Sequence, residues 1–236
     1  MTDTKVPLEN TANIPATPPS KPEARVKFWG VRGSLPTPGA GTVFYGGNTS
    51  CVEVRADGEM IILDAGTGIR PLGLQLGTEF KDQPLNIHLL LTHTHWDHIQ
   101  GFPFFAPAYN PKNKLRVLSY EGARKGLEAT LSTQMESPYF PISMREMPGN
   151  VTVGEIKDLA FDIGSVRVSA SFVNHPGVCV GYRLNTRAGS VVYVPDNELF
   201  QRLKARGPSP SNHDLPTLED FAQNQDQKLS EFVQGA

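Results

Sequence analysis

The chain has 236 residues, of which 39% are hydrophobic, and its formal net charge is −2 at pH 7. A chain of this length can bury one sizeable core, and so small a charge does not indicate nucleic-acid binding by charge alone. Its apolar runs are too short to cross a bilayer, and its N-terminus has no signal-peptide pattern. We therefore expect a soluble cytoplasmic enzyme without membrane association, in which the two cysteines, Cys51 and Cys179, are buried small hydrophobic residues rather than a disulfide framework.

The N-terminal part of the chain predicts a tail followed by the first strands. Residues 1–24 are polar and rich in proline, so we expect a disordered or extended tail before a folded domain of residues 25–236. Gly and Pro make segment 30–47 a loop, and Asp57-Gly58 is typical of a hairpin turn. Alternating polar and apolar residues predict strands at 25–29 and 51–55, and the apolar run at 60–64 is the returning strand of the hairpin.

The middle of the chain predicts helices between short strands. Hydrophobic patterning predicts helices at 69–76, 99–105 and 122–135, and strands at 87–91 and 115–119. The second half predicts strands at 160–163, 166–173, 179–184 and 190–194, followed by an amphipathic helix at 217–233 capped by Thr217. Periodicity alone thus supports a mixed α and β fold.

Four potential metal ligands lie in the six residues that follow the strand at 87–91. They are His93, His95, Asp97 and His98, in a chain that has only six histidines. Residues i and i+2 of an extended backbone point the same way, so His93 and His95 can converge on one ion. Imidazole and carboxylate suit zinc and other borderline divalent ions. A lone histidine at a strand end is usually a surface or core residue, but this density predicts a metal site.

The motif His93-x-His95-x-Asp97-His98 resembles the signature of the metallo-β-lactamase superfamily of metal-dependent hydrolases. Segments 26–34, 45–51, 62–68 and 101–105 resemble its phosphodiesterase-like branch, which is akin to tRNA 3′-processing ribonucleases and cyclic phosphodiesterases. The resemblance implies an α+β fold, an αββα sandwich with its site at the sheet edges. It also implies that the last C-terminal elements of that fold are absent from this sequence, through truncation or because another chain supplies them.

The resemblance assigns six metal ligands. The first site would hold its ion with His93, His95 and His175, and the second with Asp97, His98 and Asp196, which bridges both. Two departures weaken the second site: Pro195 replaces a small polar residue, and a further C-terminal histidine is missing, since His213 lies in an evident surface loop. The second site therefore looks one ligand short.

The implied activity is hydrolysis of a phosphodiester, small molecule or nucleic acid, by a metal-activated hydroxide that Asp97 orients as the catalytic residue. The implied cofactor is zinc, as one or two ions, with manganese or iron as other options, and a homodimer is an open option. The alternatives are a thioester or lactam hydrolase, an iron-dependent redox enzyme, and a non-catalytic metal-binding module. A substrate panel, the metal identity, and metal binding without turnover would separate these.

Other residues around the motif carry weaker expectations. Arg32, Asn48 and Ser50 are candidates for the substrate rim, or ordinary turn residues. Asp64 is equally a buried partner of a ligating histidine or a turn aspartate. His88 lies inside a strand and is expected to have no role at the metal, and the aromatic loop 137–141 would contact substrate or only pack.

Overall fold

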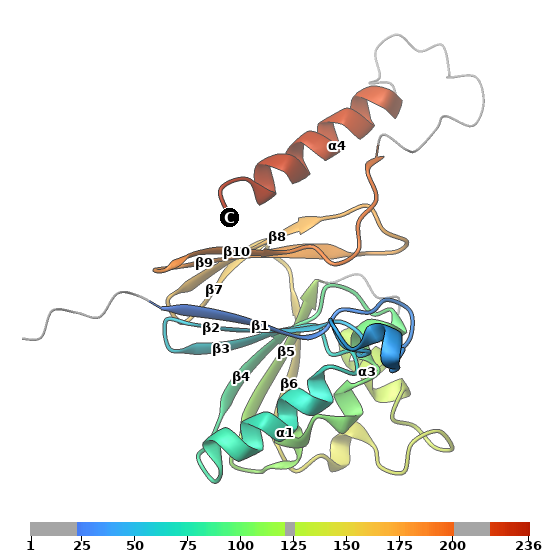
Figure 1. The fold of residues 1–236 in the computed structure, drawn as a ribbon, viewed down its shortest axis with the longest axis vertical. Coiled ribbons are helices and arrows are strands. Elements are labelled where there is room, and N and C mark those ends of the chain that lie inside the picture. The colour runs from blue at the N-terminus through green and yellow to red at the C-terminus, as the bar shows by residue number, and fades with distance from the viewer. Residues whose placement is uncertain (1–22, 121–125, 201–217) are drawn as a thin grey trace, which may run out of the picture.

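The computed structural model describes residues 23–120, 126–200 and 218–236. Two β-sheets lie face to face, and helices cover the outer face of each (Figure 1). This is the αββα sandwich that the resemblance implied. Within the described residues no helix is long and apolar enough to span a membrane.

The first sheet has six strands in the order β1-β2-β3-β4-β5-β6. Their bounds are β1 Ala24–Gly30, β2 Cys51–Ala56, β3 Glu59–Leu63, β4 Asn86–Leu90, β5 Lys114–Tyr120 and β6 Asn150–Ile156. The pairs β1–β2 and β2–β3 are antiparallel, whereas β3, β4, β5 and β6 pair in parallel. The carboxyl ends of β3 and β4 therefore meet at the same edge of the sheet, where Asp64 and the metal motif follow them.

The second sheet is antiparallel, with the order β10-β9-β8-β7. Its strands are β7 Ala160–Ile163, β8 Val166–Phe172, β9 Val180–Thr186 and β10 Gly189–Tyr193. Among the described residues, β1 is thus at one end of the first sheet and β10 at one end of the second.

Helices cover both sheets. The first sheet carries α1 (Ile69–Phe80), α2 (Trp96–Ile99) and α3 (Leu127–Thr133), and 3-10 turns lie at Ala40–Thr42, Phe102–Phe104, Ala106–Tyr109 and Met144–Glu146. The last helix, α4 (Leu218–Val233), lies outside the second sheet (Figure 1). Arg183 on β9 connects the two, because its Nη1 donates to the Phe232 carbonyl at 2.9 Å.

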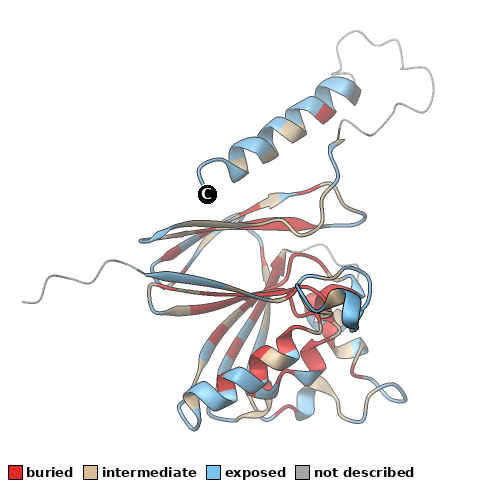
Figure 2. Cartoon of the chain, in the orientation of Figure 1, coloured by how far each residue is buried: buried red, intermediate tan, exposed pale blue. Residues whose placement is uncertain are grey.

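Two hydrophobic cores hold the layers together, and Figure 2 shows the buried residues along the strands and on the inner side of α1. Alternation along β3 divides its side chains between the cores: Ile62 packs toward the helices, whereas Ile61 and Leu63 pack toward the second sheet. Tyr182 and Leu184 meet them from β9. Each face of β3 is therefore apolar, as expected for a strand buried on both sides.

Most predicted elements are confirmed, and three expectations are wrong. Strand β6 was missed, because it is a half-buried edge strand whose alternation is interrupted by Gly154. No continuous helix occupies 99–105: α2 ends at Ile99, and a 3-10 turn follows at Phe102–Phe104. The helical hydrogen bonding does not continue, because the Gly101 amide donates to the Ala65 carbonyl. The helix expected from Gly122 begins at Leu127, and Gly126 before it has a φ of 77°.

Some expectations fall on residues outside the described ranges. These are the tail up to residue 22, residues 122–125 of the expected helix, His213 and the cap Thr217. Both cysteines are buried and free, as predicted.

Candidate metal centre

The metal motif forms the turn between β4 and α2. Leu91 donates its amide to the Leu118 carbonyl, and the Thr92 carbonyl accepts from the Val180 amide, so this turn is fixed to both sheets. The amide of Ala65 donates to the His98 carbonyl at 2.7 Å. The motif is therefore held by main-chain bonds from three separate segments.

Three histidines converge at the first predicted site. The ligand nitrogens of His93, His95 and His175 all lie within 4.8 Å of one another. His175 Nε2 is 2.9 Å from His95 Nδ1, and the rings of His93 and His175 are 4.8 Å apart. Since His175 is 80 residues from His95 in sequence, this convergence is a result of the fold.

Asp196 lies in the middle of the cluster. Its Oδ2 is 3.5 Å from His98 Nε2, 3.5 Å from His175 Nε2 and 3.9 Å from His93 Nε2. Two ligands of one tetrahedral zinc ion are separated by roughly 3.3 Å, so these distances suit a shared carboxylate. At the second predicted position the ligand atoms that lie within 4.8 Å of one another belong to His93, His98 and Asp196. Asp97 is not a member of this group, although its Oδ2 lies 3.5 Å from His98 Nε2.

The donor atoms fit a metal ion. His93 Nε2 and His98 Nε2 are buried and have no hydrogen-bond partner among the described residues. A buried polar atom without a partner is costly, and both atoms point into a cluster of nitrogen and carboxylate ligands. A divalent cation would supply the missing partner for both histidines at once.

Asp64 is the residue that orients both of these histidines. Its Oδ2 lies 2.8 Å from His98 Nδ1, and its carboxylate is also 3.0 Å from Thr92 Oγ1. Thr92 Oγ1 in turn lies 3.0 Å from His93 Nδ1. A carboxylate only accepts, so the Thr92 hydroxyl donates to Asp64 and accepts from His93. Both rings thus carry their proton on Nδ1 and direct the Nε2 lone pair toward the cluster.

Asp64 is fully buried and has a φ of 62°, in the left-handed region. It also accepts from the Thr92 amide at 2.8 Å and from the Tyr193 hydroxyl at 3.0 Å. Of the two interpretations of Asp64, the structure supports the buried partner of a ligating histidine. Thr92 and Tyr193 were missed by sequence reasoning; the one available signal was their position next to His93 and at the end of β10.

The carboxylates make the His98 position favourable for positive charge. Burial by itself would lower the pKa of His98, but the carboxylates of Asp196, 3.5 Å from Nε2, and Asp64, hydrogen-bonded to Nδ1, raise it to about 10. Burial and the neighbouring His98 lower the pKa of His93 to about 4. The nearby His98 ring lowers the pKa of Asp196. The carboxylates around His98 therefore favour positive charge at the position where a cation would bind.

The loop between β1 and β2 contacts the centre through a main-chain donor. The Ser34 amide donates to Asp97 Oδ2 at 2.7 Å. Ser34 has a φ of 67°, which non-glycine residues rarely adopt. Sequence reasoning did not assign Ser34 a role, because a main-chain contact leaves no signal in residue type.

The predicted rim residues differ in their surroundings. Arg32 and Ser50 line a cavity of about 480 Å³ that also includes Asp196. The Arg32 side chain donates from Nε to the Gly46 carbonyl at 2.8 Å. Asn48 does not line this cavity, and its side-chain oxygen accepts from Thr67 Oγ1 at 3.1 Å. Arg32 and Ser50 remain candidates, whereas the loop structure accounts for Asn48.

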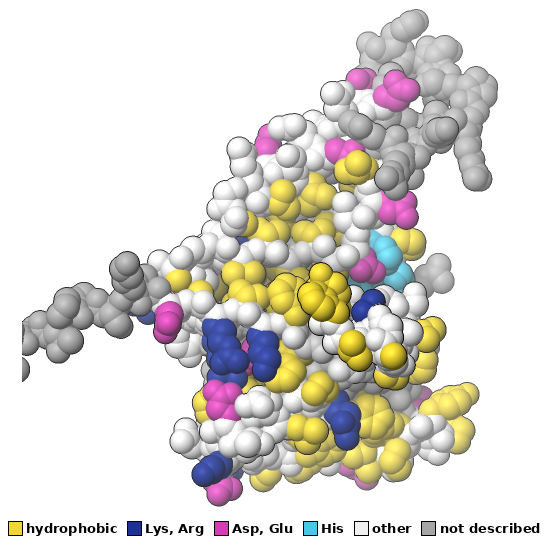
Figure 3. All heavy atoms as spheres, in the orientation of Figure 1, with side chains coloured by type: hydrophobic (Ala, Val, Ile, Leu, Met, Phe, Trp, Pro, Cys, Tyr) yellow, Lys and Arg dark blue, Asp and Glu magenta, His cyan; other side chains and the backbone are white. Residues whose placement is uncertain are grey.

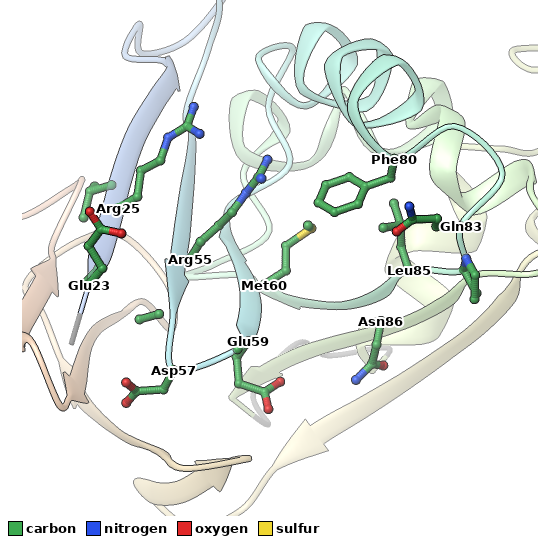
Figure 4. A pocket seen from close by; sticks show the side chains of 15 residues that line it. Glu23, Arg25, Arg55, Asp57, Glu59, Met60, Phe80, Gln83, Leu85 and Asn86 are labelled. Carbon is green, nitrogen blue, oxygen red and sulfur yellow. The ribbon is translucent and has the colours of Figure 1, made fainter. Parts of the chain in front are cut away.

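Other candidate features lie away from the cluster. His88 on β4 is 3.8 Å from Glu59, and burial lowers its pKa, in agreement with the expectation that it does not serve the metal. A second cleft, with a volume of about 880 Å³, is lined by residues such as Arg25, Arg55 and Phe80 (Figure 4). Arg55 is paired with Glu79. In loop 137–141, Phe140 packs against Phe104 and Tyr139 is exposed.

The sequence model of the beta-lactamase superfamily domain matches residues 59–212. Ribonuclease Z of Haloarcula marismortui is 27% identical over 164 residues, which are 68% of this chain and 47% of that protein. Ribonuclease Z of Haloferax volcanii is 29% identical over 77% of this chain and 55% of its own length. Ribonuclease BN of Escherichia coli is 30% identical over 55% of this chain and 44% of its own length. This chain thus spans about half the length of these curated relatives.

Two solved structures share the fold. A diphosphatase of the PhnP family superposes with a TM-score of 0.51 and 20% identity, covering 69% of this chain and 63% of that one. The metallo-beta-lactamase fold protein YhfI of Bacillus subtilis superposes with a TM-score of 0.51 and 16% identity, over 73% of this chain and 61% of that one. At these identities the likeness shows the fold alone.

Proposed function

This chain belongs to the beta-lactamase superfamily, and from that premise we propose that it is a metal-dependent hydrolase of phosphodiester bonds. The observation that carries the proposal is the cluster of His93, His95, His98, His175 and Asp196, with two buried imidazole nitrogens directed at one point. Relatives named ribonuclease Z and ribonuclease BN support the choice of phosphodiesters over other esters.

We propose zinc as the cofactor, held by His93, His95 and His175 at one position and by Asp97, His98 and Asp196 at the other. Imidazole nitrogen and carboxylate oxygen are zinc ligands, and the cluster contains no soft thiolate, since Cys51 and Cys179 are not among its members. When bound, such ions polarise a phosphoryl oxygen and lower the pKa of water to about 7.

Asp97 is the residue that we assign to orienting the attacking water. The Ser34 amide holds one carboxylate oxygen at 2.7 Å, which fixes the direction of the side chain and leaves the other oxygen available to accept a proton or hydrogen bond. Asp64 and Thr92 keep the proton of His98 and His93 on Nδ1, so the Nε2 atoms remain ligands. Arg32 and Ser50 lie on the adjoining cavity, where an ester group of the substrate would extend.

The test compares metal content and hydrolysis in matched histidine variants. Purified wild type, His95→Ala and His88→Ala are loaded with zinc, and bound metal is measured by mass spectrometry together with turnover of bis(p-nitrophenyl) phosphate. We expect His95→Ala to lose metal and at least 100-fold in rate, on the order expected when a positioned catalytic group is removed. His88→Ala should retain both, because His88 faces Glu59 outside the cluster.

Equal metal content and equal turnover in wild type and His95→Ala would refute the proposal. Metal bound by the wild type without any turnover would instead favour a non-catalytic metal-binding module. Loading the protein with zinc, manganese and iron in parallel identifies the metal that supports the highest rate.

A further inference from the structure

A groove runs from the metal cluster along the open side of the sandwich, between β1 and β10. Its volume is about 480 Å³, which lies within the range of small-molecule sites. Figure 3 shows hydrophobic side chains over this part of the molecule, next to the histidines. Asp196 and Ser50 lie at the metal end of the groove, so it opens directly into the centre described above.

Charge is confined to one end of the groove. Among the described residues, the only charged ones that line it are Arg32 and Asp196. Asp196 belongs to the metal cluster, and Arg32 lies in the loop whose Ser34 amide contacts Asp97. Away from that end, Val26 and Phe28 of β1 form one wall and Val191 of β10 forms the other. A molecule that fits this pattern has an anionic head at the metal and an uncharged apolar body along the strands.

The floor of the groove is preformed. Val52 and Leu63 line it, and they are only 2% and 0% exposed. Both belong to the core between the sheets, against which Val191 and Tyr193 also pack. A packed floor does not need to rearrange to receive a ligand, whereas the walls contain exposed side chains, with Phe28 at 65% exposure.

We propose that this groove binds the ester group of the substrate, and that the substrate class is a phosphodiester with a bulky, uncharged, apolar ester group. The proposal deepens the phosphodiesterase function and rests on it. The phosphate would lie between the metal ligands and Arg32, and the ester group would pack on Val26, Phe28 and Val191. A long polyanion fits less well, because Arg32 is the one cation that lines the groove in the part of the chain that the structure describes.

The ester group can be an alkyl chain or an aromatic ring, and the experiment separates the two. Methylphosphonate, hexylphosphonate and phenylphosphonate serve as probes, because each has the anionic head and a single substituent and cannot be hydrolysed. Their affinities for the zinc-loaded protein are measured by isothermal titration calorimetry. We expect hexylphosphonate, phenylphosphonate or both to bind at least about 10-fold more tightly than methylphosphonate, since even one methylene in an apolar pocket is worth roughly that factor.

Two variants test the location. Val26→Asp places a charge in the groove, and Phe28→Ala removes part of one wall; Val26 is 39% exposed and Phe28 is 65% exposed, so both changes are compatible with folding. Each should reduce the preference over methylphosphonate to less than about threefold. The matched controls are Val233→Asp, at a position 41% exposed, and Phe221→Ala, at one 48% exposed, both on α4. These controls should keep the wild-type ratio.

Equal affinities of the three phosphonates, or no binding of any of them, would overturn the proposal. So would a preference that survives both groove variants. If Val26→Asp converts a dimer into a monomer in light scattering and leaves the ratio unchanged, the groove belongs to a second copy of the chain and the proposal falls. Because the probes are not hydrolysed, a protein that prefers the bulky phosphonates but has no turnover would retain the groove and lose the phosphodiesterase function. A protein that hydrolyses bis(p-nitrophenyl) phosphate without that preference would retain the phosphodiesterase function and refute the role of the groove.

Discussion

Replacing Asp64 with Asn tests how the metal ligands are oriented. The carboxylate accepts from His98 Nδ1, Thr92 Oγ1, the Thr92 amide and the Tyr193 hydroxyl, all at 2.8–3.0 Å. An asparagine has one oxygen and one NH₂ group in the same space. If the NH₂ group faces the Thr92 amide, two donors oppose each other. If it faces His98, the ring accepts on Nδ1 and must carry its proton on Nε2, where it cannot bind metal.

Either orientation weakens the centre by an amount that can be stated. A lost hydrogen bond to a buried carboxylate costs about 1.5–3 kcal/mol. Loss of such a partner typically lowers metal affinity 10–100-fold, which corresponds to about 1.4–2.7 kcal/mol. The two ranges agree, so we expect zinc affinity at the His98 position to fall 10–100-fold and the zinc-loaded protein to become less stable.

The assay for Asp64→Asn is competition for zinc against a chelating dye, with urea unfolding of the loaded protein alongside. The control is Asp162→Asn, which breaks an ion pair with Arg167 between side chains that are 60% and 53% exposed. Such a pair contributes about 0–1 kcal/mol, so zinc affinity should be unchanged. Zinc affinity and stability at wild-type values in Asp64→Asn would refute the assignment of Asp64 as the orienting residue.

Three further predictions follow from the same geometry. Ser34→Gly should keep activity and gain about 1 kcal/mol in the free energy of urea unfolding, because glycine adopts the φ of 67° freely and its amide still donates to Asp97. Ser34→Pro should lose activity, because proline has no amide proton to donate to Asp97. Gly101→Ala should destabilise the protein by at least 2 kcal/mol, on the order of other core overpacking, because its Cβ would lie 2.1 Å from the Gly66 carbonyl oxygen. The control Gly77→Ala in α1 meets nothing within 4 Å and should stabilise the protein by about 1 kcal/mol. Thermal unfolding of both variants measures these changes. Without metal, in the presence of a chelator, the pKa of His98 is about 10 in the folded protein against 6.5 for an ordinary histidine, so the stability that protonated His98 contributes is complete below pH 6.5 and is lost as the pH rises toward 10. The free energy of unfolding in urea should therefore decline from pH 6 through 7.5 to 9 in chelator, and zinc should abolish the decline. A flat profile in chelator would contradict this prediction.

Sequence predicted best where the signal is local. The spacing of His93, His95 and His98 after an apolar strand predicted a metal site, and the structure places these side chains in one cluster. Strand positions were predicted well where both sheet faces are buried, as in β3 and β4, because such strands are almost continuously apolar. Strand β6 was missed because an edge strand needs less apolar surface and so carries a weaker pattern.

The parts that the sequence left open or did not predict depend on contacts between distant residues. The sequence left two interpretations of Asp64, because Asp64 contacts His98 only where β3 and β4 pair in parallel and end at the same edge, and no local pattern specifies that pairing. Nothing in the sequence distinguishes Thr92 from other threonines, and its role follows only from the position of its hydroxyl between His93 and Asp64. Ser34 acts through its main chain, to which residue type gives no direct guide.

The arrangement of the centre explains why its orienting bonds come from such distant parts of the chain. The unpartnered Nε2 atoms of His93 and His98 are directed by bonds at the other nitrogen of each ring. The Asp64 carboxylate holds His98 directly, and it holds His93 through the Thr92 hydroxyl. That carboxylate is itself buried and must be satisfied, which requires the Tyr193 hydroxyl from the second sheet as a further donor. The centre can therefore form only after both sheets have packed, so metal affinity should report on docking of the second sheet as well as on the ligands. A Tyr193→Phe variant should accordingly bind zinc less tightly, although Tyr193 belongs to neither group of clustered ligands. Unchanged affinity in that variant would show that Asp64 orients the histidines without the donor from the second sheet.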